Sequence, residues 1–103
     1  MKLSILELAE ADLFDAFQFY ERQASGIGRY FLDTLYSDIE SLRLYAGIHR
    51  KVFGFHRVLS RRFPFAIYYI CAESEVQIWR VLDCRKNPKS IYRQLKNTRK
   101  RIR

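Results

Sequence analysis

Apolar and polar positions follow a strand period and then a helix period in the first half of the chain. Residues 2–7, KLSILE, place Leu3 and Ile5 between polar neighbours, a pattern that predicts a short strand. From residue 8 to residue 23 apolar positions recur at helical spacing, which predicts a helix that buries Leu13, Ala16, Phe17 and Tyr20. A second helix is expected over about residues 28–46, with a buried stripe of Phe31, Leu35, Ile39 and Leu42. Because the break ASGIG between them is short, the two helices should form an antiparallel hairpin.

After Gly47 the period changes to two, which indicates strands. The segment FGFHRVLS alternates Phe55, Arg57 and Leu59 with His56, Val58 and Ser60. Residues 65–72 are apolar on both faces, which is typical of a central strand covered on both sides. Proline cannot donate a ladder hydrogen bond, so Pro64 is expected at the start of that strand.

One more strand and a helix complete the pattern. After the turn AESE, the strand VQIWRVLD should place Val76, Ile78 and Leu82 on one face and Trp79 and Val81 on the other. Pro88 can open a final helix, whose apolar side is formed by Ile91, Leu95, Thr98 and Ile102. The order βααβββα predicts one α+β domain over residues 1–103, in which an N-terminal strand and a helical hairpin pack on an antiparallel sheet and a basic helix ends the chain.

Composition supports a packed domain and excludes several classes of protein. The 103 residues are 49% hydrophobic and 16% aromatic, which is ample for a core. Cys71 and Cys84 lie far apart with no histidine at ligand spacing, so we expect no structural zinc, no disulfide framework and no cofactor. Glu7 comes too early for a signal peptide, and no apolar run reaches the length of a membrane span. We therefore expect a cytoplasmic protein.

Charge is divided unevenly along the chain. Residues 1–42 hold eight acids and three bases, whereas residues 43–103 hold sixteen bases and three acids, which gives net charges of −5 and +13. Residues 85–103 alone carry nine bases and no acid. Such an excess exceeds what solubility requires, and it predicts an anionic partner, either nucleic acid or an acidic protein.

Two adjacent arginines, Arg61 and Arg62, stand immediately before the predicted central strand. Neighbouring residues on a strand point to opposite faces, so at most one of the two can face the helices. A solvated hairpin end would account for one of them. Both together, near the sheet edge that also carries Arg85 and Lys86, predict a rim that faces an anion.

Four motifs in order resemble the RelE/ParE superfamily of toxins from bacterial type II toxin–antitoxin modules. They are A-x-x-D-L in the first helix, Y-E-x-Q-x-x-G-x-G at the helical turn, R-R-F-P-F-x-I-Y-Y at the central strand and V-L-D-x-R-K-x-P after the last strand. The resemblance covers roughly residues 3–95 and is greatest to the ParE-like plasmid-stabilisation branch. It implies a toxin that arrests growth when its antitoxin is degraded. Such a toxin acts either on DNA gyrase or as a ribosome-dependent mRNA endoribonuclease.

The endoribonuclease alternative requires a catalytic set. RNA cleavage must deprotonate a 2′-hydroxyl, stabilise the phosphate and protonate the leaving oxygen. The resemblance implies arginines, lysines and a C-terminal tyrosine in these roles, for which the candidates are Arg57, Arg62, Arg80, Arg85, Lys86 and Tyr92. Asp83 departs from the family pattern, since many relatives have a histidine there, and His56 is expected to be a surface or capping residue. We therefore favour the gyrase inhibitor, which needs a binding surface and no catalysis. A degenerate member that only binds antitoxin is the third alternative.

The basic rim, the basic C-terminal segment and the exposed-looking aromatic residues predict two protein-binding surfaces for such a toxin. The expected target-binding residues are Arg61, Arg62, Arg85, Lys86, Lys89, Arg93 and Lys96. The expected antitoxin-binding residues are Phe14, Phe19 and Arg57, against which an acidic amphipathic segment of the antitoxin would lie along the helical hairpin and the sheet. No metal and no membrane are expected to take part.

Overall fold

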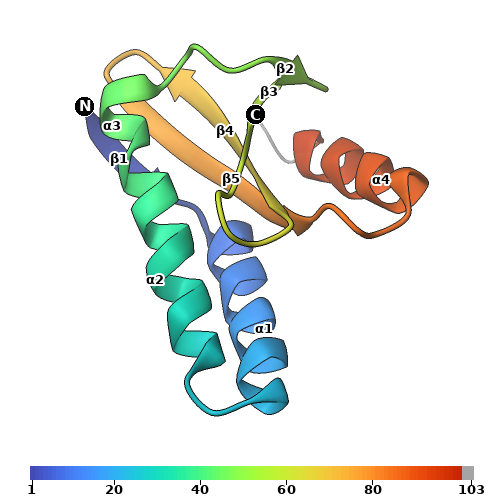
Figure 1. Ribbon diagram of the computed structural model, residues 1–103. Coiled ribbons are helices and arrows are strands. Elements are labelled where there is room, and N and C mark those ends of the chain that lie inside the picture. Colours follow the sequence, from blue (N-terminus) through green and yellow to red (C-terminus); the bar gives the residue numbers. More distant parts are fainter. Residues whose placement is uncertain (101–103) are drawn as a thin grey trace.

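A five-stranded sheet separates a helical hairpin from a single C-terminal helix. The computed structural model describes residues 1–100. The elements are β1 (Lys2–Ile5), α1 (Glu7–Gln23), α2 (Ile27–Glu40), α3 (Leu42–Tyr45), β2 (Lys51–Val52), β3 (Phe55–Leu59), β4 (Phe65–Ala72), β5 (Glu75–Asp83) and α4 (Pro88–Arg99). Figure 1 shows α1 and α2 side by side, extending away from the sheet, and α4 lying apart from them. The predicted α+β class and hairpin are confirmed. The helix expected over about residues 28–46 is divided at Ser41 into α2 and α3, and the two-residue β2 is additional.

The sheet is mixed rather than antiparallel. Its strand order is β1-β5-β4-β3-β2, and β1 runs parallel to β5 with Leu3 opposite Val76. The other neighbours are antiparallel, as predicted. Nothing in the sequence indicated that β1 runs parallel to its neighbour. The apolar alternation within a strand carries no information about the direction of the strand that pairs with it.

Two hydrophobic cores lie on opposite faces of the sheet. One contains Leu13 of α1 with Phe31, Leu35, Ile39 and Leu42, the whole predicted stripe of the second helix. The other contains Leu95 of α4 packed on Phe55, Ala66, Tyr68 and Leu82. Residues Phe65–Tyr69 are buried, so β4 is a central strand covered on both sides, as expected. Ile102 of the predicted last helix lies outside the described residues.

A β-bulge changes the faces predicted for β5. Tyr68 pairs with Arg80 while the next residue, Tyr69, pairs with Ile78, so Trp79 is an extra residue in β5. Val81 consequently joins Ile78 in the core under the hairpin, and Leu82 joins Trp79 in the core under α4. The prediction that Leu82 shares a face with Val76 and Ile78 was therefore wrong, because it assumed an unbroken alternation.

The α1–α2 turn is held by a carboxylate and by a close backbone approach. Glu21 accepts hydrogen bonds from the backbone N–H groups of Gly26 and Gly28, each at 2.9 Å, which satisfies donors at the start of α2. Gly26 has φ +92°, and a Cβ atom on Gly28 would lie 2.7 Å from the carbonyl oxygen of Phe17. The glycines of the Y-E-x-Q-x-x-G-x-G motif thus allow the two helices to meet.

Within residues 1–100, no helix combines the length and the apolar character needed to cross a membrane.

Candidate functional site

The turn between β3 and β4, which carries Arg61 and Arg62, is anchored to α2. Asp38 of α2 is only 6% exposed and accepts hydrogen bonds from Ser60 Oγ at 2.6 Å and from the Arg61 backbone N–H at 3.3 Å. The Arg61 side chain also reaches this carboxylate, with Nε 3.4 Å from Oδ1, although it is largely exposed. Arg61 therefore has a carboxylate partner in the protein, whereas the ion pairs found in residues 1–100 include none for Arg62.

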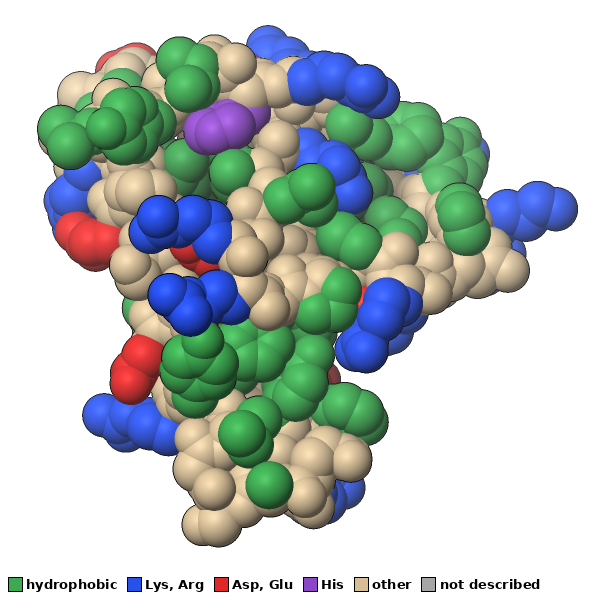
Figure 2. Space-filling view, in the orientation of Figure 1, with side chains coloured by type: hydrophobic (Ala, Val, Ile, Leu, Met, Phe, Trp, Pro, Cys, Tyr) green, Lys and Arg blue, Asp and Glu red, His purple; other side chains and the backbone are tan. Residues whose placement is uncertain are grey.

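An aromatic cluster lies between Arg62 and Arg85. Phe63 of the same turn packs against the rings of Tyr20, Tyr30 and Phe31, with centroids 5.1–5.5 Å apart. Arg62 donates to the Tyr30 hydroxyl at 3.0 Å, and Arg85 donates to the Tyr20 hydroxyl at 3.5 Å. Figure 2 shows Lys and Arg side chains on both sides of hydrophobic side chains where the sheet meets the hairpin. The structure thus brings two of the predicted target-binding arginines, Arg62 and Arg85, to one aromatic surface.

Asp83 and Arg85 form a local ion pair at the end of β5. The Arg85 guanidinium donates to both carboxylate oxygens of Asp83, at 3.1 and 2.8 Å, and the Arg85 backbone N–H donates at 2.8 Å. The hydrogen bonds from Arg85 hold the pKa of Asp83 below its usual range. Asp83 is therefore a fixed anion near neutral pH and not a candidate proton donor.

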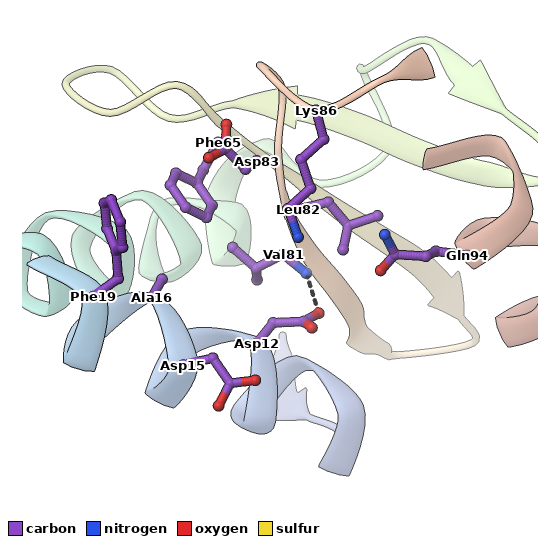
Figure 3. A pocket seen from close by; sticks show the side chains of 10 residues that line it. All are labelled: Asp12, Asp15, Ala16, Phe19, Phe65, Val81, Leu82, Asp83, Lys86 and Gln94. Atoms are coloured by element: carbon purple, nitrogen blue, oxygen red, sulfur yellow. Dashed lines mark hydrogen bonds between the residues drawn. The ribbon is translucent and has the colours of Figure 1, made fainter. Parts of the chain in front are cut away.

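A pocket of about 290 Å³ opens between α1, the end of β5 and α4. Its apolar lining comes from Ala16, Phe19, Phe65, Val81 and Leu82, and its polar lining from Asp12, Asp15, Asp83, Lys86 and Gln94 (Figure 3). Phe19, an expected antitoxin contact, and Lys86, an expected target contact, therefore share one depression. Phe14 does not line this pocket; its ring is exposed and stacks on Phe17.

Arg80 is enclosed by other side chains. Its guanidinium donates to both carboxylate oxygens of Asp12 at 2.8 Å, to Thr98 Oγ1 at 3.0 Å and to Gln94 Oε1 at 3.3 Å. The side chains of Arg80 and Asp12 are 13% and 14% exposed, respectively. Asp12 also accepts the backbone N–H of Val81, drawn as the dashed line in Figure 3. The structure thus gives this catalytic candidate a clear structural role, which is to join α1, β5 and α4.

Arg57 lies on the α4 face of the sheet. Its Nε donates to the Tyr68 hydroxyl at 3.2 Å, and its Nη2 lies 3.6 Å from Cys84 Sγ. Burial works against the charge, but the hydrogen bond with Tyr68 and the proximity of Cys84 hold the pKa of Arg57 above its usual range. It is a fixed cation, separated by the sheet from the aromatic surface between Arg62 and Arg85.

The outer side of α4 is a basic stripe, which we define as Lys89, Arg93, Lys96 and Lys100. These residues recur at helical spacing and are exposed. Tyr92 lies beside the stripe, with its ring centroid 4.4 Å from that of Phe53 in the β2–β3 turn. Tyr92 therefore contacts the β2–β3 turn and does not face Arg80 or Arg85.

The two histidines belong to a structural network. Tyr69 accepts the backbone N–H of Gly47 and bonds Nδ1 of His49, while Nδ1 of His56 donates to the His49 carbonyl oxygen. His56 also stacks on the Tyr69 ring. Burial lowers the pKa of His49, and the neighbouring His56 lowers it further. This network ties the loop before β2 to the sheet.

The predicted site residues thus separate into groups. Arg62, Arg85 and Lys86 lie near the hairpin, Arg57 and the basic stripe lie on the α4 side, and Arg80 is enclosed between α1 and α4. The sequence did not identify Asp12, Asp38, Tyr20 and Tyr30 as the partners that hold these cations. Two of these partners do fall within the four motifs, Asp12 in A-x-x-D-L and Tyr20 in Y-E-x-Q-x-x-G-x-G. Cys71 and Cys84 are free thiols, and residues 1–100 contain no group of three or more His, Cys, Asp or Glu side chains placed to hold a metal ion.

Comparison with known proteins identifies a fold and no more. No protein-family model matches the chain, and no curated protein matches it. Among solved structures, the chain is similar to a chain of the chromosomal ParDE TA system from P. aeruginosa, with a TM-score of 0.68 and 24% sequence identity. The alignment covers 79% of this chain and 92% of that chain. This protein therefore has the fold of that ParDE chain.

Proposed function

We propose that the protein is the toxin of a type II toxin–antitoxin module, that it inhibits DNA gyrase in the cytoplasm and that a cognate antitoxin neutralises it. The observation that carries the proposal is the shared fold with a chain of a ParDE TA system over 79% of this chain. The four ordered motifs and the basic second half support it.

The positions of the catalytic candidates favour inhibition by binding. Arg80 is paired with Asp12, Arg57 contacts Tyr68 and Cys84, and Tyr92 packs on Phe53. A nuclease needs a proton acceptor, a proton donor and cations around a single phosphate. These three groups contact different partners and do not converge on one point, and such an arrangement suits a surface that engages a protein.

The target surface in this proposal combines two regions. Arg62, Arg85 and Lys86 form its centre around the aromatic cluster, and Arg61 extends it along the turn. The cations of α4 that are predicted to join it are Lys89, Arg93 and Lys96. Fixed guanidinium groups set on a rigid turn suit charged recognition, because little side-chain freedom is lost on binding.

The antitoxin surface in this proposal is the pocket between α1 and the end of β5. Its apolar lining with Phe19 fits the apolar side of an amphipathic segment, while Lys86 and Arg85 at the same end fit acidic residues. Phe14 and Arg57 would extend this contact along α1 and across the sheet. Antitoxin bound there would cover Lys86 and hinder the target.

A ribosome-dependent endoribonuclease is the second candidate. The observation that favours it is the exposed Tyr92 ring, 43% accessible, with Lys96 Nζ 5.8 Å from its centroid. A phenol beside a cation is a possible proton donor to a leaving oxygen. Tyr92→Phe would remove that donor and leave the packing on Phe53.

Two assays on the purified chain test the proposal. The parent protein should inhibit DNA supercoiling by gyrase. The double variant Arg62→Glu with Lys86→Glu should be at least tenfold less potent as an inhibitor. Lys2→Glu, an exposed charge reversal at the other end of the sheet, is the matched control and should inhibit normally.

The other outcomes each exclude the gyrase proposal. Translation-dependent mRNA cleavage that Tyr92→Phe abolishes would identify a nuclease. Antitoxin binding without growth arrest, supercoiling inhibition or cleavage would identify a degenerate member. A chain that arrests no growth and binds no antitoxin encoded beside it would exclude the toxin–antitoxin assignment altogether.

A further inference from the structure

The turn between β2 and β3 contains a phenylalanine in an unfavourable backbone conformation. Phe53 and Gly54 have φ of +53° and +85°. Two-residue hairpin turns with both central residues at positive φ favour Asn-Gly, because a bulky side chain is strained there. Gly54 suits its φ of +85°, at which other residues are strained, and a Cβ atom there would lie 3.0 Å from the Arg99 guanidinium, which would have to shift. Phe53 therefore occupies a position where asparagine would suit the backbone better.

The Phe53 ring forms an aromatic pair at the surface. It packs on Tyr92 of α4 with centroids 4.4 Å apart and planes inclined by 58°. Even so, Phe53 is 48% and Tyr92 43% exposed. The partial burial of these rings thus offsets only part of the backbone strain at Phe53. Each ring keeps an exposed face on which a flat group can stack.

Cations surround this aromatic pair. A shallow cavity of about 420 Å³ is lined by Phe53, Tyr92, Lys96, Arg99 and Lys100. Lys96 Nζ lies 5.8 Å from the Tyr92 centroid, and Arg99 Cζ lies 6.0 Å from the centroid of the buried Phe55 ring beneath. No acidic residue occurs in the sequence after Asp83, so α4 contributes only positive charge. In Figure 2 hydrophobic side chains at α4 are flanked by Lys and Arg side chains.

We propose that this aromatic and basic surface binds single-stranded nucleic acid without sequence preference. Lys96, Arg99 and Lys100 contact the phosphates, and bases stack on the exposed faces of Phe53 and Tyr92. Exposed aromatic rings combined with a positive groove are the features by which proteins hold unpaired strands. The phosphates of duplex DNA can contact the cations, but its bases cannot stack on the rings because they are already stacked on each other. An acidic peptide likewise satisfies only the cations. The proposal requires neither gyrase nor an antitoxin.

Fluorescence anisotropy with the purified full chain tests this inference. The probe is labelled oligo(dT) of about 12 nucleotides, within the usual site sizes, with oligo(U) as the RNA arm. Binding should weaken as salt rises, and unlabelled single strands should compete better than duplex of equal length. Tyr92→Ala and Phe53→Asn should each weaken binding about tenfold, the loss expected for one stacked base. Tyr36→Ala, which removes a comparably exposed tyrosine from α2, should bind normally.

Phe53→Asn separates binding from folding. It creates the favoured Asn-Gly turn, so the hairpin should keep its thermal stability while the aromatic surface is lost. Lys96→Ala with Lys100→Ala should reduce the slope of log affinity against log salt by about 1.4. The inference is overturned if both aromatic variants bind oligo(dT) as tightly as the parent. It is equally overturned if poly-glutamate displaces the probe as well as unlabelled oligo(dT) does.

Discussion

At the scale of single residues, two largely buried acids organise this basic protein. Asp12 holds Arg80, and Asp38 holds the turn with Arg61, so two carboxylates of the acidic half fix elements of the basic half. Each accepts backbone and side-chain donors together. Neither acid is distinguishable from a solvated helical acid by sequence spacing alone, although both lie next to buried apolar positions.

Asp12→Ala should lower the free energy of unfolding by about 3 kcal/mol, because the largely buried Arg80 guanidinium would lose its counterion. Urea unfolding followed by circular dichroism measures this loss. Asp33→Ala removes a carboxylate from an exposed pair with Arg29 and is the control, with an expected change below about 0.5 kcal/mol. Equal effects of the two substitutions would show that the Asp12 pair does not hold the elements together.

His49 should make stability depend on pH. Its Nδ1 shares a hydrogen bond with the Tyr69 hydroxyl, and burial and then the neighbouring His56 lower its pKa, so the folded protein favours the neutral ring. The unfolded chain, with a histidine pKa of about 6.5, therefore takes up the proton first as pH falls. The contribution is fully present above about pH 6.5 and is lost as pH falls through the lower folded pKa. Unfolding free energies measured across this range should decline less in His49→Gln; an identical decline would exclude His49 as the cause.

At the scale of elements, two local features determine how the helices and strands pack: the close approach of α1 to α2 and the bulge in β5. The close approach of α1 and α2 is possible because Gly28 has no side chain against Phe17 and Glu21. The bulge at Trp79 allows β5 to place Ile78 and Val81 in one core and Leu82 in the other. These local irregularities decide which residues reach each face of the molecule.

Gly28→Ala should destabilise the protein by about 1–3 kcal/mol, because the new methyl group meets the Phe17 carbonyl and forces the helices apart. Gly26→Ala has open space around its Cβ position and suffers only backbone strain, of about 1 kcal/mol. Thermal unfolding of the two variants compares these costs. If Gly26→Ala proved the more harmful, the close approach at Gly28 would not limit the hairpin.

Elements with strong local periodicity were predictable, and their mutual arrangement was less so. The stripe of Phe31, Leu35 and Ile39 and the two-sided burial of β4 follow from the spacing of apolar residues. The parallel pairing of β1 was not predictable, because it depends on competition between strand edges. The basic residues of the candidate site could be named from the sequence. The hydroxyl and carboxylate groups of α1 and α2 that bind them could be identified only from the structure.

At the scale of the whole molecule, the uneven charge of the sequence should govern partner binding. The net charge is +8, and no acid follows Asp83. An acidic partner is attracted both at the turn with Arg62 and along α4. This attraction acts before contact and is screened by salt.

Binding of the proposed antitoxin should therefore weaken markedly between low and high salt. Isothermal titration or anisotropy with the purified pair measures the dissociation constant at each ionic strength. Lys89→Ser with Arg93→Ser lowers the positive charge outside the pocket and should flatten the dependence. An affinity indifferent to salt would contradict the electrostatic account and leave apolar burial as the main attraction.

The pairing of the first strand with the last has a consequence for synthesis. Ser4 donates to Glu75, which follows it by 71 residues, and Arg80 reaches back to Asp12 across 68. Contacts of such high sequence separation form late in folding. On the ribosome α1 and α2 can associate early, but β1 must wait until β5 has emerged. A nascent chain consequently lacks both the β1 edge of its sheet and the Asp12–Arg80 contact until β5 has left the ribosome.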